Sequence, residues 1–202
     1  MRIKYYALWL SLICIIVFVI QMVFSGFTEF FVLDASAPLE VWRFLTAVFL
    51  HGSLSHLISN LFALALFGTI LESVIGSRKF LWIFFVSGIV ANLIAINFYS
   101  LSLGASGAIY GLLGALIILR PMMTVWVYSL PMPMFVAGIL WVGAGVFGLF
   151  APSNVGDIAH LSGIAVGFIF GLFWRERLMS RQRNDRIILD ERDIRDWEER
   201  HL

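Results

Sequence analysis

Long apolar segments limit how this chain can fold more than any other feature. Five of them lie near residues 6–24, 54–72, 80–98, 132–150 and 158–174. A helix crosses the roughly 30 Å hydrocarbon core of a bilayer with about 17 to 25 such residues. A sixth, shorter segment runs from about 105 to 119. The sequence therefore predicts an all-α integral membrane protein with six transmembrane helices.

The composition agrees with this prediction, because 60% of the residues are hydrophobic and only 13% are charged. A soluble globular domain carries about 25% charged residues. Arg2 and Lys4 precede the first apolar segment, as in a signal peptide. That segment is longer than a signal-peptide core, however, and no A-x-A cleavage pattern follows it, so we expect it to be retained as a span. The single cysteine, Cys14, excludes a disulfide within the chain.

The basic residues predict the orientation of the spans. With the N-terminus in the cytoplasm, Arg43 is the one residue of the 14 lysines and arginines that lies outside, as the positive-inside rule favours. We expect a six-span domain over residues 1–174 and a charged cytoplasmic tail over 175–202. The protein is then placed in the cell membrane with both termini in the cytoplasm. The segment 25–46 mixes aromatic with charged residues and is expected to form an interfacial loop.

Four polar side chains are expected at a similar depth in the outer half of the membrane. Ser106 lies about 14 residues, or roughly 21 Å of helix, above Arg120 at the inner end of its span. His160 is about equally far from the inner end of the last span. His56 and Asn60 bracket the same height on the second span and share one helix face, because they are four residues apart. Polar residues inside a membrane are costly and are therefore candidates for function.

These side chains suit nucleophilic catalysis. A serine hydroxyl becomes a nucleophile when a histidine accepts its proton, so Ser106 and His160 form a candidate pair. Ser106 is expected to open its helix, where unpaired backbone N–H groups favour an oxyanion. His56 and Asn60 can donate further hydrogen bonds to the same point.

Glycines around this pair predict close helix packing. Gly104 and Gly107 flank Ser106 and leave room for a substrate carbonyl and for a neighbouring helix. That neighbour is expected to be the last span, because glycines recur at every fourth position on both helices. They are Gly163, Gly167 and Gly171 on the last span and Gly107 and Gly111 on the fourth.

Three nearby residues are assigned other roles. Tyr110, one turn below the serine, can stack on the imidazole, although such a tyrosine by itself also fits simple packing. Asp157 is expected to start its helix or to lie on the surface, which leaves a Ser-His dyad without a third member. His51 is expected at the outer interface, with its ring diverging from that of His56 around a helix, so no metal site is predicted.

Together these residues resemble the rhomboid family of intramembrane serine proteases over about residues 40–174. The motifs are Trp42-Arg43, His51 with His56-x-x-x-Asn60, Gly104-Ala105-Ser106-Gly107 with Tyr110, and Ala159-His160-x-x-Gly163-x-x-x-Gly167. The resemblance implies that Ser106 is the nucleophile and His160 the general base. It also implies an oxyanion hole made by His56, Asn60 and the backbone N–H of Ser106, with Tyr110 packed on His160.

The resemblance further implies what such a protein acts on. Its substrates would be single-pass membrane proteins, cut near the outer end of their transmembrane helix after entering past a mobile fifth span. No cofactor would be needed. The expected partners are these transmembrane substrates and membrane lipid, and not nucleic acid.

Two other functions fit part of the pattern. A non-catalytic relative would bind transmembrane helices without cutting them and would not need Ser106 and His160 at one depth. A channel or transporter would carry polar residues down to the cytoplasmic side, whereas the segment below Ser106 is apolar.

Overall fold

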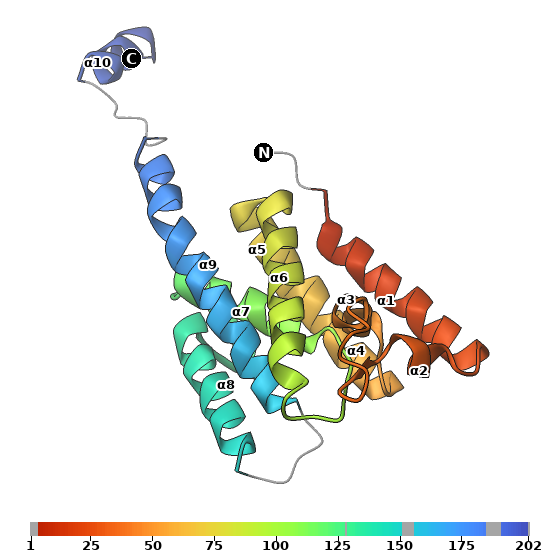
Figure 1. The fold of residues 1–202 in the computed structure, drawn as a ribbon. Coiled ribbons are helices and arrows are strands. Elements are labelled where there is room, and N and C mark those ends of the chain that lie inside the picture. The colour runs from red at the N-terminus through yellow and green to blue at the C-terminus, as the bar shows by residue number, and fades with distance from the viewer. Residues whose placement is uncertain (1–3, 128, 151–155, 185–190, 202) are drawn as a thin grey trace.

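The computed structural model describes residues 4–127, 129–150, 156–184 and 191–201. They form a bundle of helices with two short pairs of strands (Figure 1). In chain order the elements are α1 (Tyr6–Val23), α2 (Phe27–Phe31), β1 (Leu33–Asp34), α3 (Arg43–Thr46), η1 (Ala47–Phe49), α4 (Leu54–Ala63), η2 (Leu64–Gly68), α5 (Thr69–Ile75), α6 (Ser77–Ala95), β2 (Leu101–Ser102), α7 (Ser106–Leu119), β3 (Thr124–Val127), β4 (Leu130–Pro133), α8 (Met134–Gly148), α9 (Asp157–Asn184) and α10 (Glu191–His201).

Among the described residues, four helical stretches are long and apolar enough to cross a membrane. They are Tyr6–Val23, Leu54–Ile75, Ser77–Ala95 and Asp157–Arg175. The helices α7 and α8 are also apolar but shorter, with 14 and 15 residues. All six coincide with the apolar segments of the sequence, so the chain is a multi-pass membrane protein. The number of complete spans and their orientation stay predictions.

The chain is mostly helical, as predicted, but two pairs of connecting segments form short strands that the sequence did not predict. The strand β1 pairs antiparallel with β2, and β3 pairs antiparallel with β4. Pairing satisfies backbone N–H and C=O groups that would otherwise lack partners away from water. The first pair also ties the segment after α2 to the segment that leads into α7.

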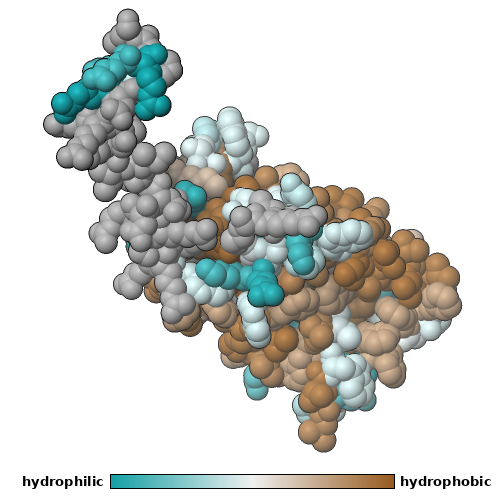
Figure 2. All heavy atoms as spheres, turned by 90° about the horizontal axis from the view of Figure 1, so that it is seen from above, coloured by the Kyte–Doolittle hydropathy of each residue, from teal (hydrophilic) through white to brown (hydrophobic). Residues whose placement is uncertain are grey.

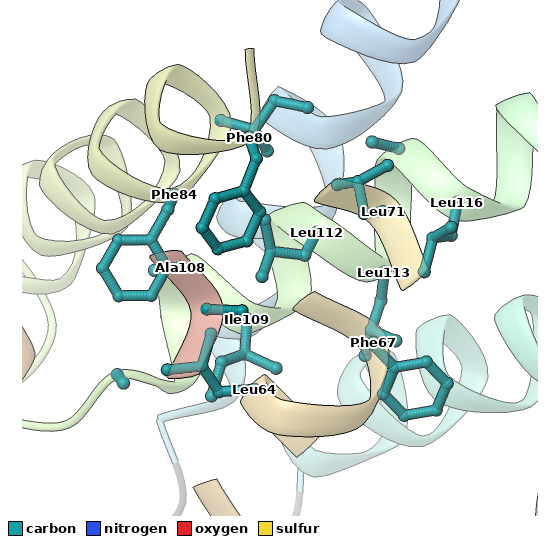
Figure 3. Close-up of a cluster of buried hydrophobic side chains, with 14 of the residues drawn as sticks. Leu64, Phe67, Leu71, Phe80, Phe84, Ala108, Ile109, Leu112, Leu113 and Leu116 are labelled. Atoms are coloured by element: carbon teal, nitrogen blue, oxygen red, sulfur yellow. The ribbon is translucent and has the colours of Figure 1, made fainter. Parts of the chain in front are cut away.

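The short helix α7 lies at the centre of the bundle. Nine of its 14 residues are buried. Figure 3 shows Leu112 and Leu116 of α7 in one cluster with Phe80 and Phe84 of α6 and Leu71 of α5. Because protein surrounds it, a helix in this position can begin beneath the membrane surface without exposing its preceding loop to lipid.

The helices α7 and α9 approach each other backbone to backbone. A Cβ atom added to Gly163 would overlap the carbonyl oxygen of Gly107, and one added to Gly167 would overlap that of Gly111. No residue with a side chain fits at such a crossing, where small residues let helices pack closely. The predicted glycine contact between these two helices is confirmed.

A buried carboxylate holds the start of α1. Glu72 of α5 is fully buried and accepts hydrogen bonds from the backbone N–H groups of Tyr6 and Ala7, both at 3.1 Å. The hydroxyl of Ser77 donates a third bond at 2.6 Å. The first N–H groups of a helix lack partners within it and carry partial positive charge, so a carboxylate there is stabilising. This contact ties α1 to the junction of α5 and α6.

The helix α9 continues past the predicted end of the last span, at residue 174, and projects beyond the bundle (Figure 1). Figure 2 looks onto the end of the molecule that is uppermost in Figure 1. Hydrophilic residues gather near the middle of this face, and hydrophobic residues cover much of the surface beside them. This distribution suits a bundle whose flanks meet lipid and whose end meets water. Of the predicted tail, residues 185–190 and 202 lie outside the described residues.

Candidate active site

The turn before α7 positions Ser106 as the first residue of that helix. Gly104 has φ +122°, a conformation that residues with side chains rarely adopt, and its N–H donates to the carbonyl oxygen of Ala47 at 2.9 Å. A Cβ atom on Gly104 would also lie 2.7 Å from Cε1 of His56. Glycine is therefore required here both by the backbone and by the neighbouring imidazole. The first N–H groups of a helix have no partner within it, and α7 has no side-chain cap at this end.

The first turn of α9 brings His160 to Ser106. The distance between Nε2 of His160 and Oγ of Ser106 is 2.9 Å, which is a hydrogen bond. The two residues are 54 positions apart in the sequence, and the glycine crossing of α7 and α9 lies directly below them. The packing of these helices thus places an alcohol and an imidazole in direct contact.

Tyr110 fixes the plane of the imidazole. Its ring stacks on that of His160 with a centroid distance of 4.2 Å and an interplanar angle of 9°. Both side chains are half-buried. Stacking restrains rotation of the imidazole and favours the orientation in which Nε2 faces the serine.

The helix α4 supplies His56 and Asn60. Ser53 caps this helix, because its Oγ accepts the N–H of His56 at 3.1 Å. The imidazole of His56 lies against Gly104, two residues before Ser106. Asn60 is buried, and its Nδ2 donates to the carbonyl oxygen of His56 at 2.8 Å. One N–H of the Asn60 amide is therefore engaged with its own helix.

His51 is closer to this group than the sequence indicated. Its ring is 2% exposed and lies edge-on to that of His56, with centroids 5.1 Å apart. The expectation that the two rings diverge around a helix is wrong, because α4 begins only at Leu54 and residues 50–53 are not helical. A helical spacing rule does not apply across that boundary.

The surroundings of His51 keep it uncharged. Nδ1 lies 3.2 Å from the carbonyl oxygen of Phe49, which can only accept, so Nδ1 carries the proton. Burial, together with the neighbouring His56, lowers the pKa of His51 to about 4. Since this value is well below neutral pH, the imidazole next to His56 is neutral there and adds no positive charge to the site.

Asp157 starts α9, as predicted, but its side chain is buried and not on the surface. Its carboxylate packs against Gly148 at the end of α8, where a Cβ atom would overlap it. An acidic residue in the first turn also complements the helix dipole. The observed position therefore supports a role in joining α8 to α9.

The loop before this site is anchored by Arg43. Its guanidinium is mostly buried, donates to the carbonyl oxygens of Glu29 and Val32 at 2.7 Å each, and pairs with the carboxylate of Glu40. Charge-assisted bonds of this kind are stronger than neutral ones. Arg43, the one basic residue predicted to lie outside, thus forms contacts within the protein. These contacts agree with the interfacial loop expected over residues 25–46.

Comparison with known proteins places this site in a family. Residues 38–177 match the Rhomboid domain. The chain is 36% identical over 131 residues to rhomboid protease GluP of Bacillus subtilis, an alignment that covers 64% of this chain and 25% of that protein. It is 30% identical over 171 residues to rhomboid protease GlpG of Serratia proteamaculans, covering 82% of this chain and 60% of the relative.

A plant relative matches to a similar degree. RHOMBOID-like protein 6, mitochondrial, of Arabidopsis thaliana is 32% identical over 134 residues, which cover 65% of this chain and 43% of the relative. The chain thus spans between a quarter and three fifths of the length of these three proteins. Since the matched region contains Ser106, His160, His56 and Asn60 and extends over more than half of the chain, the chain belongs to the rhomboid family.

Proposed function

We propose that this protein is an intramembrane serine endopeptidase that cleaves the transmembrane helices of single-pass membrane proteins near their outer end. The observation that carries the proposal is the 2.9 Å contact between Oγ of Ser106 and Nε2 of His160 at the start of an enclosed helix. Two relatives named as rhomboid proteases support the same function.

The geometry suits a two-step reaction. Oγ of Ser106 attacks the scissile carbonyl carbon while Nε2 of His160 takes the hydroxyl proton, which forms a tetrahedral oxyanion. When the C–N bond breaks, His160 returns the proton to the leaving amine and an acyl-enzyme remains on Ser106. Water then attacks the ester carbonyl while Nε2 of His160 takes its proton. When the bond to Oγ breaks, His160 returns that proton to Ser106 and the acid product leaves. The stacked ring of Tyr110 holds the imidazole in place through both steps.

Three donors are proposed to stabilise the oxyanion. They are the backbone N–H of Ser106, the imidazole of His56 and the second N–H of the Asn60 amide. Such donors act strongly because they are already oriented before charge develops. The contact of His56 with Gly104 supports this role, since Gly104 lies two residues before Ser106.

We also propose that all six apolar helices span the bilayer, with both termini in the cytoplasm. The distribution of basic residues supports this orientation, which directs the Ser106 end of α7 outward. The short length of α7 supports a site sunk beneath the outer surface, where water enters from outside.

The sharpest test of the enzyme is covalent labelling of the serine. A fluorophosphonate probe reacts with a serine only when a neighbouring base activates it. We expect the detergent-solubilised protein to be labelled at Ser106, as located by mass spectrometry of the peptides, and His160→Ala to lose the label. Ser73→Ala, at an exposed position of α5, is the matched control and should be labelled like wild type. A folded protein that takes no label would instead favour a relative that only binds transmembrane helices.

The oxyanion role of His56 predicts a selective loss of rate. Removing one oxyanion donor typically costs about 10²- to 10³-fold in kcat. We expect His56→Ala to lower kcat on a purified transmembrane substrate by this factor with little change in KM. Ser59→Ala, whose exposed hydroxyl bonds the same backbone carbonyl of His56, is the control and should keep its rate. An unchanged kcat in His56→Ala would remove the histidine from the oxyanion hole.

A further inference from the structure

A groove lies at the opposite end of α7 from Ser106. It has a volume of about 570 Å³. Its lining residues come from the end of α5, the end of α7 and the segment that follows: Val74, Leu119, Arg120, Pro121, Met122 and Met123. Since α7 has 14 residues, this groove is about 20 Å from the catalytic serine. It is therefore a separate site.

The lining combines an apolar wall with one fixed positive charge. Five of the six lining residues carry no polar side-chain group, and the two methionines are flexible enough to fit a chain of variable shape. Arg120 lines the groove and is exposed. A guanidinium stays charged at all physiological pH values and binds phosphate oxygens through two parallel hydrogen bonds. A ligand with an apolar chain and a phosphate at one end matches both the apolar wall and the positive charge of Arg120.

The size of the groove agrees with such an occupant. A single water takes up about 30 Å³, so 570 Å³ is far more than a hydrated ion needs. A wall of valine, leucine and methionine would also hold water poorly. An acyl chain fills this kind of space favourably.

The neighbouring hairpin places the groove at a membrane interface. On β3, Val125 and Val127 are buried, whereas Trp126 is 70% exposed. Met122, which lines the groove two residues before this strand begins, is 72% exposed. Exposed tryptophan is typical of the boundary between hydrocarbon and headgroups, because the ring is apolar and its N–H is polar. The apolar surface of the groove therefore continues onto the hairpin.

Basic residues gather at the same end of the bundle. Arg78 and Lys79 stand in the first turn of α6, directly after the end of α5 that contributes Val74. Lys79 also lies over the ring of Trp174 at 5.2 Å. Glu72, the nearby carboxylate, is fully buried and engaged with α1. The exposed charge near the groove is thus positive, which favours an anionic ligand.

We propose that this groove binds one anionic phospholipid of the bilayer, with an acyl chain along the apolar wall and the phosphate on Arg120. The same segment holds the start of α8. The carbonyl oxygens of Pro121 and Met123 accept the N–H groups of Phe135 and Met134 at 3.0 and 2.8 Å. Because α8 begins on the residues that line the groove, the bound lipid stabilises the attachment of this helix.

The test compares two lipids on the full-length protein in detergent. Native mass spectrometry after addition of palmitoyl-oleoyl phosphatidylglycerol or phosphatidylcholine should show one retained phosphatidylglycerol and about tenfold weaker retention of phosphatidylcholine. A charge-assisted hydrogen bond of about 1.5 kcal/mol corresponds to this factor. Arg120→Gln should reduce phosphatidylglycerol retention about tenfold and phosphatidylcholine retention less, because the choline cation of phosphatidylcholine already offsets the charge of its phosphate.

Two control variants make the test decisive. Arg78→Gln removes an exposed basic residue that does not line the groove and should leave lipid retention unchanged. Met123→Ala enlarges the groove and should weaken retention of both lipids. Equal retention of the two lipids would overturn the proposal, and so would loss of phosphatidylglycerol in Arg78→Gln with none in Arg120→Gln. Labelling of Ser106 reports folding of each variant and tests the proposed protease separately.

Discussion

Ser106→Ala is expected to reduce cleavage of a transmembrane substrate by about 10⁶-fold, as found when a nucleophile or its base is removed from a serine protease. The variant removes the oxygen that would form the proposed acyl-enzyme, while alanine occupies no more volume than serine and is well tolerated in a helix. The measurement is product formation from a purified single-pass substrate in liposomes that also contain the protease.

The serine and the histidine should act as one unit. His160→Ala is expected to lose activity to within about tenfold of Ser106→Ala, and the double variant should be no worse than either single one, because such effects are strongly non-additive. Ser73→Ala is again the control that retains full activity. If Ser106→Ala kept more than a tenth of the wild-type rate, or if the two losses multiplied, the paired mechanism would be wrong.

The second large effect is expected at the crossing of α7 and α9. Gly167→Leu places a side chain where the carbonyl oxygen of Gly111 lies, so the two helices must separate. We expect the free energy of unfolding in detergent to fall by about 4–5 kcal/mol, the range of severe core substitutions. Because separation also moves His160 away from Ser106, fluorophosphonate labelling should be lost in any variant protein that still folds.

A matched glycine on α8 provides the control. A Cβ atom on Gly143 would meet no other atom within 4 Å. The free energy of unfolding of Gly143→Leu should therefore stay within about 1 kcal/mol of the wild-type value, the size of a change in helix propensity. Equal stability of Gly167→Leu and Gly143→Leu would show that the crossing tolerates side chains and that the close approach of α7 and α9 is not required.

Local features of the sequence predicted much of this architecture. Hydrophobicity and length alone placed all six apolar helices, because each must satisfy its own backbone hydrogen bonds in lipid. Repeated glycines predicted which two helices cross closely, and the start of α7 at Ser106 followed from the short apolar segment. These predictions succeed because they depend on neighbours along one helix.

Other features depended on contacts between distant segments. The pairing of β1 with β2, the anchoring of Arg43 on two carbonyl oxygens and the cap that Glu72 provides for α1 join residues that no local pattern connects. The position of His51 relative to His56 was predicted wrongly for a related reason. Its distance from His56 depends on where α4 begins, which Ser53 determines by capping.

The sequence by itself determined that the chain is a helical membrane protein and predicted which polar side chains share a depth. Both inferences use only the cost of burying polar groups and the rise of a helix, which are properties of each segment alone. Only the tertiary structure decided that Ser106 and His160 are in contact and that a groove with Arg120 exists at the far end of α7. It also showed that the Asn60 amide donates one N–H to its own helix. Distances between helices depend on how their surfaces interlock, and that packing involves every helix at once.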